Sequence, residues 1–453
     1  MITIMCEFIH LERIDSPMMT LHKRVIALVI FSVIIVFIIC QIPFRNTVKI
    51  GITSSNNVKE YSEYFKENKI CNCKIQFVYL GNDKEADSDP FKATFENIYR
   101  ALSNGDVDMV IAVEEDYLLP MTTDNVLYNL KEIVDFSCLS DDIKNFIESS
   151  NNEVYFIPSS LDSVRVLLVN NNLMTELGIP IPQNQLEFDE FCNLLVLIEQ
   201  KIKQNDKKNT YALSLGSPID EFLYDDISKF LSPLYNYADL NMYLDYYVKL
   251  LDISKRYSYR RKDIGNKYPL DFHFSQNNIV LKIATLYELE LFKNSDLSDK
   301  TPHKPYIQNF SVSVLPHPYI DGYNYTLGNI QLMAVSRKTK HLTECADIIK
   351  FFLSEKHARN IIELENPFSA NIVSIPVIQS DTISESLYKK YSFINFHYGD
   401  NFSPHFFPKN YDLYWQSKNE EQELVNEYID DKITPTEFKL QMKKIIKSVK
   451  GQK

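Results

Sequence analysis

The sequence is poor in glycine and contains almost no tryptophan. Only 10 of its 453 residues are glycine, one is tryptophan, and neither G-x-G-x-x-G nor G-x-x-x-x-G-K-[ST] occurs. A loop that cradles phosphates needs glycines so that its backbone can approach the ligand, so a nucleotide-binding enzyme is not indicated. The hydrolase motifs G-x-S-x-G and H-E-x-x-H are also missing, and no S-x-x-K is set in its usual context. Paired carboxylates are present, but a hydrolase is the weaker interpretation.

Positive charge is also in short supply. Lys and Arg total 48 against 60 Asp and Glu, which gives a formal net charge of -12. A partner with a phosphate backbone needs a basic face, so the balance argues against nucleic acid. Hydrophobic residues make up 45% of the chain, which is typical of a globular protein. The length exceeds one ordinary core and suits two lobes.

The seven cysteines and nine histidines show no metal-ligand spacing. Cys71 and Cys73 form C-x-C, which differs from the C-x-x-C of a zinc knuckle, and no second pair follows. We expect the cysteines to be small buried apolar residues together with up to one disulfide. The sequence therefore predicts neither a metal nor a cofactor.

An apolar run without charge, Val25–Cys40, follows the basic residues His22, Lys23 and Arg24. This is the pattern of an export signal. Cys40 is a candidate lipid-accepting cysteine, although Ile39 stands where a lipoprotein signal has a small residue. The alternatives are an uncleaved membrane anchor and ordinary secretion, for which the small-residue cleavage pattern is absent. In each case the rest of the chain is expected to face outward.

Beyond this run the pattern indicates alternating strands and helices. Strands are expected at Asn46–Ser54, Cys73–Leu80 and Val107–Val113, with helices at Val58–Lys69 and Phe91–Leu102 between them. The order β-α-β-α-β begins a doubly wound parallel sheet, in which ligands bind beyond the carboxyl ends of the strands. Further strands are expected at Tyr155–Pro158, Val164–Asn170, Tyr211–Leu215, Asn278–Thr285, Phe310–Pro316 and Ile330–Ser336. The tail Glu420–Lys447 reads as helical and charged.

Several segments, in order, resemble the carbohydrate class of extracellular solute-binding proteins, the maltose-binding-like type. The most specific segment is Glu153–Leu195, and five others follow the same order. Its matching positions are Pro158, Val169-Asn170, Leu173, Leu177-Gly178-Ile179, Pro182 and Phe188-Asp189-Glu190-Phe191. The other matching segments are Asp106–Leu118, Leu127–Asp135, Phe274–Phe292, Val314–Pro318 and Gly328–Arg359.

The resemblance covers the chain from Val48 onward and implies a two-lobed periplasmic-binding-protein-like α/β fold of type II. Each lobe would be a mostly parallel sheet flanked by helices, with hinge strands between the lobes. The segments expected from it are 1–44 (signal or anchor), 45–157 and 281–336 (lobe 1), and 158–280 and 337–453 (lobe 2). Asn277, Asn278 and Tyr287 depart from the family pattern, which leaves the identity of the ligand open.

The resemblance also implies a function: a monomer at the outer face of the cell membrane that delivers a sugar to the permease of an ABC-type importer. Such a site needs aromatic faces for the sugar ring and carboxylates or amides for its hydroxyls. Loop positions after the predicted strands supply both kinds of residue. The candidate ligand-binding residues are Ser54, Ser55, Glu114, Glu115, Asp116, Tyr117, Asp162, Ser163, Tyr287 and Asn329. Two alternatives stay open: a membrane-anchored sensor or adhesion protein with this fold, and a binder of peptides or other non-sugar solutes.

Overall fold

The computed structural model divides the chain into a short N-terminal unit and one compact unit, Val48–Lys453. The structure describes residues 47–53, 58–81, 90–118, 121–122, 124–139, 141–148, 152–162, 164–207, 210–214, 240–257, 274, 277–286, 289, 311–319, 329–363, 374–378, 380–391 and 411–450. The apolar run Val25–Cys40, with the lipidation candidate Cys40, lies outside these residues. No helix in the described ranges is long and apolar enough to cross a membrane.

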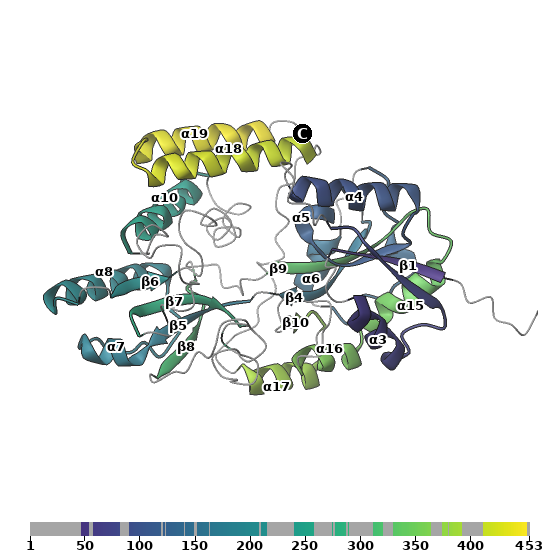
Figure 1. The fold of residues 1–453 in the computed structure, drawn as a ribbon, viewed down its shortest axis with the longest axis horizontal. Helices are drawn as coiled ribbons and strands as arrows, with labels where there is room; N and C mark the ends of the chain where they lie inside the picture. The colour runs from purple at the N-terminus through teal and green to yellow at the C-terminus, as the bar shows by residue number, and fades with distance from the viewer. Residues whose placement is uncertain are drawn as a thin grey trace, which may run out of the picture. The chain divides into compact units, whose positions relative to one another are not determined.

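Ten described strands form two sheets (Figure 1). The six-stranded sheet has the order β10-β4-β9-β3-β1-β2, and the four-stranded sheet has the order β6-β7-β5-β8. The strands are β1 (Thr47–Ile52), β2 (Lys74–Tyr79), β3 (Met109–Glu114), β4 (Phe156–Asp162), β5 (Arg165–Asn170), β6 (Tyr211–Ser214), β7 (Ile279–Thr285), β8 (Val312–Pro316), β9 (Asn329–Val335) and β10 (Ser374–Pro376). The first nine confirm the strands expected from the sequence; β10 was not predicted.

The described helices are α3 (Val58–Asn68), α4 (Pro90–Asn104), α5 (Glu115–Leu118), α6 (Asp141–Ile147), α7 (Asn171–Glu176), α8 (Phe188–Gln204), α10 (Leu240–Tyr257), α15 (Leu342–Phe352), α16 (Glu355–Ile362), α17 (Asp381–Lys390), α18 (Tyr411–Ile429) and α19 (Pro435–Lys450), with a 3-10 turn, η2, at Leu130–Glu132. The mixed α/β class predicted from the sequence is therefore confirmed.

The strand directions correct one detail of that prediction. β1 pairs with β3 in parallel, and β6 with β7, as expected for α/β units. However, β9 runs antiparallel to both β3 and β4, and β5 runs antiparallel to both β7 and β8. Both sheets are thus mixed rather than mostly parallel. The cause is the path of the chain. The chain leaves the six-stranded sheet after β4, forms the strands of the four-stranded sheet, and re-enters the first sheet with the start of β9 beside the end of β4.

Sheet membership also differs from the segment limits expected for the lobes. β8 and most of β7 fall in 281–336, expected in lobe 1, but both strands belong to the four-stranded sheet. In the segment 337–453, α15 and α16 contribute to the core cluster of the six-stranded sheet, whereas α18 and α19 pack with α10 in the other cluster. The reason is that the chain crosses back at β9, after β8. The assignment of chain segments to the two lobes stays a prediction.

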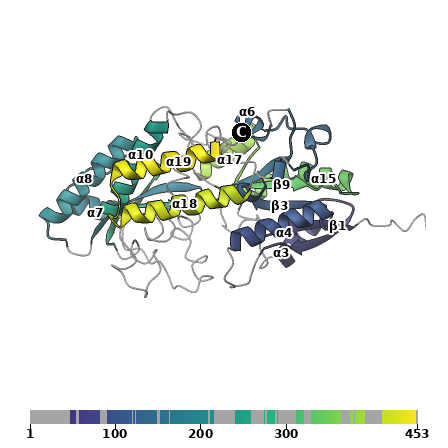
Figure 2. The same ribbon diagram turned by 90° about the horizontal axis from the view of Figure 1, so that it is seen from above.

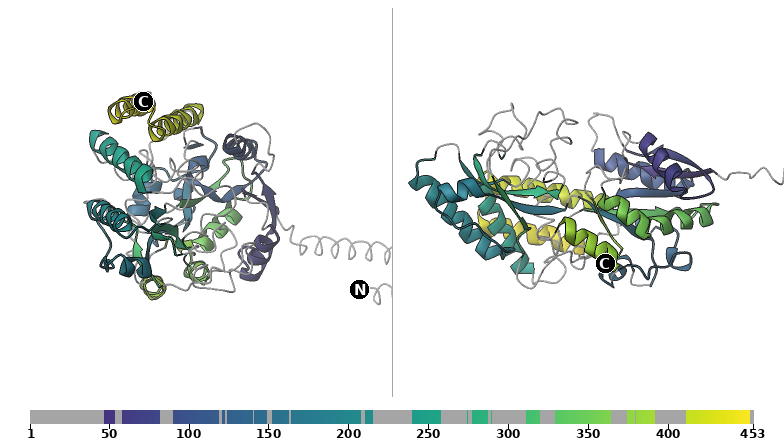
Figure 3. Two further views of the ribbon diagram at one scale, coloured as in Figure 1. Left: turned by 60° about the vertical axis from the view of Figure 1, so that its left-hand side comes forward. Right: turned by 90° about the horizontal axis from the view of Figure 1, so that it is seen from below.

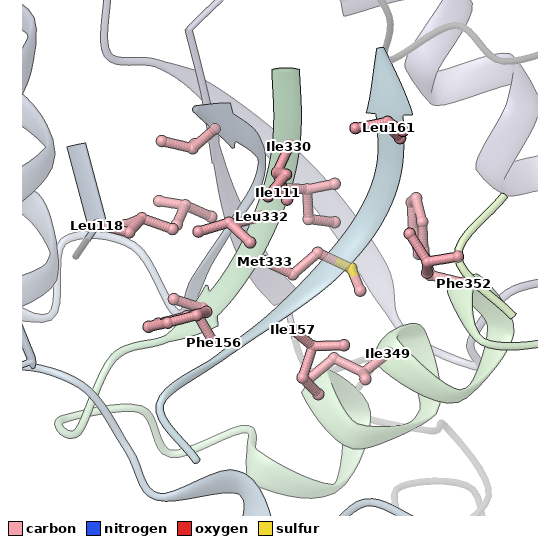
Figure 4. Packing of buried hydrophobic residues seen from close by; sticks show 14 of the residues in the cluster. Ile111, Leu118, Phe156, Ile157, Leu161, Ile330, Leu332, Met333, Ile349 and Phe352 are labelled. Carbon is pink, nitrogen blue, oxygen red and sulfur yellow. The ribbon is translucent and has the colours of Figure 1, made fainter. Parts of the chain in front are cut away.

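The largest hydrophobic cluster surrounds the middle strands of the six-stranded sheet, β4, β9 and β3. Ile111, Ile157 and Leu332 are fully buried, as expected for strands with continuous apolar runs. Figure 4 shows Ile157 of β4 beside Ile349 of α15, while the successive β9 residues Leu332 and Met333 point in different directions. Both faces of these strands are therefore covered, and only their ends can present polar groups to a ligand.

The segment of strongest family resemblance owes its shape to two helix ends. Gly178 has a φ of +66°, and the Ile179 N–H donates to the Met174 carbonyl at 2.9 Å, which closes α7. At the start of α8 the Glu187 N–H donates to the Glu190 carboxylate at 3.1 Å. Phe188 and Phe191 then point into the core of the four-stranded sheet. Helix capping and burial thus explain why the residues at these positions match the family pattern.

The C-terminal tail is helical, as predicted, and consists of two helices. α18 and α19 lie side by side next to α10, as Figure 2 and Figure 3 show. The break comes at Asp431, whose φ is +59°, followed by Thr434, which caps α19 before Pro435. Phe438 is fully buried against Tyr247 and Tyr428. This turn lets the charged tail bury an apolar face on both arms.

Two histidines are buried in the neutral state. Burial lowers the pKa of both His317 and His357 from 6.5 to about 3, and the nearby Arg165 adds to the effect at His317. His357 Nδ1 lies 2.7 Å from the Tyr64 hydroxyl, while its Nε2 has no hydrogen-bond partner among the described residues. Protonation of His357 would bury a positively charged imidazolium with one N–H unpaired, next to the ring of Phe352.

These two histidines predict that acid weakens the fold. Below pH 6.5 the unfolded chain takes up protons that the folded chain refuses, so the free energy of unfolding decreases as the pH falls from 6.5 toward 3. Each histidine contributes a slope of about 1.4 kcal/mol per pH unit, and its contribution is complete above pH 6.5. Urea unfolding between pH 6.5 and 5.5, where carboxylates titrate little, measures this slope.

The variant His357→Gln should remove about half of that slope, because glutamine stays neutral at every pH. An unchanged slope in His357→Gln would show that His357 takes up its proton in the folded chain as readily as in the unfolded one.

Candidate ligand-binding site

One edge of the six-stranded sheet collects the ends of four strands. β1 is parallel to β3, and β4 has the same direction as β3 because both are antiparallel to β9. The carboxyl ends of β1, β3 and β4 therefore meet the amino end of β9 at one edge. Loops at the carboxyl ends of such strands are where α/β proteins bind ligands.

Three predicted site residues lie at this edge. Glu114 is the last residue of β3, Asp162 is the last residue of β4, and Asn329 is the first residue of β9. The register pairs Asp162 directly with Asn329, while Glu114 pairs with Gln331, which in turn pairs with Ser160. Positions that are 167 to 217 residues apart in the sequence are thus neighbours on three adjacent strands.

The two faces of the sheet differ at this edge. Direct partners across a sheet share a face, and residues two apart along a strand do as well. Glu114, Gln331, Ser160 and Asp162 therefore share one face. The other face carries the buried residues Val113, Leu332, Ile330 and Leu161. The edge is thus polar on one face and anchored in the core by the other.

A β-bulge lies on each side of β9 just before this edge. β3 shifts register between Val110 and Val113, and β4 shifts between Pro158 and Ser160. Ala112, in the first bulge, has a φ of +53°, and Ser159, in the second, donates its hydroxyl hydrogen to the Gln331 carbonyl at 3.1 Å. Bulges re-aim the side chains that follow them and are common beside functional sites. Without them, Glu114 and Asp162 would point to the other face.

Asp162 is the most deeply buried acid of the site, at 2% exposed. A carboxylate removed from water needs hydrogen-bond donors to compensate. The Ser160 hydroxyl, itself 2% exposed, supplies one to Asp162 Oδ1 at 2.9 Å. Glu114 is half-buried at the end of the neighbouring strand. The edge therefore offers one fixed, buried carboxylate and a second that is closer to solvent.

The other predicted site residues are less well placed by the structure. Ser54, Ser55, Ser163 and Tyr287 lie outside the described residues. Glu115 and Asp116 belong to the short helix α5, which follows Glu114, and their side chains are not described. Tyr117 is 8% exposed and belongs to the core cluster of the sheet, so most of its ring contacts protein. The ligand contacts of all these residues stay predictions.

Three polar residues at this edge were not predicted from the sequence. They are Ser159, Ser160 and Gln331. Two serines inside an otherwise apolar strand, immediately before Asp162, are the signal that could have found the first two. Lys282 was not predicted as a notable residue either. It is fully buried in the middle of β7 and pairs across the sheet with Leu168 and Ser214.

The donor set fits hydrogen bonding to a polar solute. Carboxylate and amide oxygens accept hydrogen bonds from hydroxyls, and serine hydroxyls can donate as well as accept. Within the described ranges, no group of three or more His, Cys, Asp or Glu side chains is placed to hold a metal ion.

The strained bulge gives a prediction on stability. The left-handed backbone of Ala112 costs about 1–2 kcal/mol for a residue with a Cβ, and glycine removes this cost. Since glycine loses about 0.5–1 kcal/mol more through chain entropy, Ala112→Gly should raise the free energy of unfolding by about 0.5–1 kcal/mol. Urea denaturation measures the change.

Ala334→Gly is the matched control on the adjacent strand β9, where the backbone φ is not positive. It should lower the free energy of unfolding by about 1 kcal/mol, because only the entropy and packing costs apply. Equal destabilisation by both substitutions would contradict the strained bulge in β3.

Comparison with known proteins places the fold. No family model matches the sequence, and no curated protein matches it. Solved structures do match. An ABC substrate-binding protein from Listeria monocytogenes in complex with cycloalternan is 13% identical, with a TM-score of 0.59 over 90% of this chain and 99% of its own.

Two further solved structures are similar to the chain to about the same degree. The sugar-binding protein MalE from Xanthomonas citri is 15% identical, with a TM-score of 0.60 over 90% of this chain and 97% of its own. The cyclic alpha-maltosyl-1,6-maltose binding protein from Arthrobacter globiformis is 14% identical, with a TM-score of 0.59 over 89% and 98%. The fold predicted from the sequence, that of two-lobed MalE-like solute-binding proteins, is therefore confirmed.

Proposed function

We propose that the chain is an extracytoplasmic solute-binding protein that captures a sugar or oligosaccharide and delivers it to an ABC-type importer. The observation that carries the proposal is the polar face formed by Glu114, Gln331, Ser160 and Asp162 at the strand-end edge of the six-stranded sheet. The structures that share this fold include proteins described as sugar-binding. The proposed activity is binding rather than catalysis.

In this proposal the two carboxylates accept hydrogen bonds from sugar hydroxyls. A charge-assisted hydrogen bond is stronger than a neutral one, and it gains further where water is excluded. Ser160 holds Asp162 Oδ1, so the orientation of that carboxylate is set before the ligand arrives. A group held in its bound orientation loses less freedom on binding, which favours affinity. Glu114, which is nearer to solvent, contacts the incoming sugar before Asp162 does in this proposal.

A ligand screen tests the proposal. Purified full-length protein is heated with maltooligosaccharides, cyclic glucans, peptides or polyamines, and the melting temperature is recorded. A sugar that binds only the folded chain raises the melting temperature by mass action. We expect a shift with at least one sugar. A shift with peptides alone would establish the peptide-binding alternative and overturn the sugar assignment.

Substitutions then locate the site. Asp162→Asn and Glu114→Gln each remove a charged acceptor while preserving shape, and each should weaken sugar binding about 10- to 100-fold, since a hydrogen bond to a charged group is worth about 1.5–3 kcal/mol. Glu96→Gln on the exposed side of α4 is the control and should bind normally. Full affinity in both site variants would place the site elsewhere.

Delivery is separable from binding. If the native cell takes up the labelled sugar normally when it carries Asp162→Asn, although binding is lost, the chain serves as a sensor or adhesion protein instead of an importer subunit.

We further propose that the run Val25–Cys40 tethers the protein to the outer face of the cell membrane, either through a lipid on Cys40 or as an uncleaved anchor. The basic residues before the run and its uniform apolar character support this. Intact-mass measurement of protein purified from membranes distinguishes the two. A lipid-modified Cys40 at the new N-terminus, lost in Cys40→Ala, identifies a lipoprotein, and an unprocessed chain identifies an anchor. Recovery of the chain only in the medium would contradict tethering.

A further inference from the structure

A disulfide joins Cys71 and Cys73 in the turn between α3 and β2. Both cysteines are half-buried, and Asn72 between them is exposed, so the bond lies at the surface of the protein. β2 is the outermost strand of the six-stranded sheet, at the end opposite β10. In this order β2 lies two strands from β3, which carries Glu114, and four strands from β4, which carries Asp162, and neither cysteine belongs to the proposed ligand site.

The turn that carries this disulfide is held by other interactions. Asn68 donates from Nδ2 to the Tyr64 carbonyl at 3.0 Å, and the Ile70 N–H donates to the Phe65 carbonyl at 3.3 Å. Lys69 takes the left-handed backbone that ends α3, with a φ of 50°. Ile70 is 7% exposed and anchors the turn in the core. These contacts do not pass through sulfur, so opening the bond leaves them in place.

The small ring also limits what the disulfide contributes to the fold. A disulfide stabilises chiefly by restricting the unfolded chain, and its effect grows with the number of residues that it encloses. Here the ring encloses only Asn72 between the two cysteines. The bond thus adds little to stability, and its reduction has little cost in folding free energy.

From this surface position, the independently held turn and the small ring, we propose that Cys71–Cys73 is a reversible thiol–disulfide exchange site whose substrates are free thiols. A substrate thiolate attacks one sulfur, forms a mixed disulfide, and releases the other cysteine as a thiolate that takes up a proton. A second substrate thiolate attacks the substrate's sulfur in the mixed disulfide and releases the remaining cysteine. The two cysteines gain two electrons and two protons overall, and two thiols become one disulfide.

The surroundings of the cysteines fit this role. The exposed residues Lys69 and Lys74 flank the pair along the chain, and positive charge favours the leaving thiolate. The free cysteines of the described chain are different. Burial raises the pKa of the Cys192 thiol to about 11 and of the Cys345 thiol to about 12, and it also raises the pKa of Cys138. These thiols stay protonated near neutral pH and are poor nucleophiles.

Native-state exchange tests the proposal without any knowledge of the sugar ligand. The folded full-length protein is incubated with reduced glutathione, alkylated, digested and mapped by mass spectrometry. We expect Cys71 and Cys73 to become alkylated, and Cys192 and Cys345 to remain largely unlabelled. The far-ultraviolet circular dichroism should not change, and the melting temperature should shift by less than about 4 °C. Oxidised glutathione should then restore the disulfide.

Single substitutions trap the intermediate. In oxidised glutathione, the remaining cysteine of Cys71→Ser or Cys73→Ser should attack the glutathione disulfide, release one reduced glutathione and keep a stable glutathione adduct, because the resolving thiol is gone. The double variant Cys71→Ser/Cys73→Ser should accumulate none in this turn and should melt within a few degrees of the parent protein. The proposal fails if the two cysteines alkylate without prior reduction, if they resist reduction until the chain unfolds, or if the reduced protein loses its structure.

Discussion

The placement of β9 between β3 and β4 is the constraint on which the rest of the fold and the site depend. This strand comes more than 160 residues after β4 in the sequence, yet it supplies the hydrogen bonds that join the two halves of the six-stranded sheet. Its apolar residues fill the middle of the core, and its first residues lie beside the last residues of β3 and β4. The chain must therefore come back from the four-stranded sheet to add β9 to the six-stranded sheet. The point at which β9 begins sets the position of the polar edge.

The two bulges show how the same strand pairing serves packing and also sets the face on which the proposed site lies. A strand with regular alternation would keep Glu114 and Asp162 on the wrong face, or would bring apolar side chains to the edge. One extra residue in each neighbour of β9 re-aims the strand ends while the pairing on either side continues. The left-handed Ala112 is the local cost of this arrangement. Strain beside a proposed site, offset by a well-packed core, is a recurring pattern in binding proteins.

The sequence predicted the parts of the fold that depend on local pattern. The apolar strand β3 and the helices α3 and α4 all follow from the pattern of neighbouring residues. Asp162, Glu114 and Asn329 were found because polar residues at strand ends are a local signal. The directions of β5 and β9 were not predictable in this way, because they depend on which distant strand each one meets. The break at Asp431 was missed although the sequence carries a local signal for a new helix start, the capping residue Thr434 followed by Pro435.

The role of Ser160 could not be predicted from the sequence. A serine in a strand is ordinary, and only the burial of Asp162 beside it makes its hydroxyl significant. Its role therefore emerges from the pairing of strands, which also brings Gln331 to the same face. The proposed binding site is in this sense a property of the assembled sheet: its acids can be picked out in the sequence, whereas the residues that support them cannot.

Hydrogen–deuterium exchange of the full-length protein, with and without the most stabilising sugar, tests the central claim most directly. The account predicts slower exchange at the ends of β3 and β4 and at the start of β9, where the polar face lies. Protection confined to segments away from this edge, such as α18 and α19, or no protection with any sugar, would contradict it.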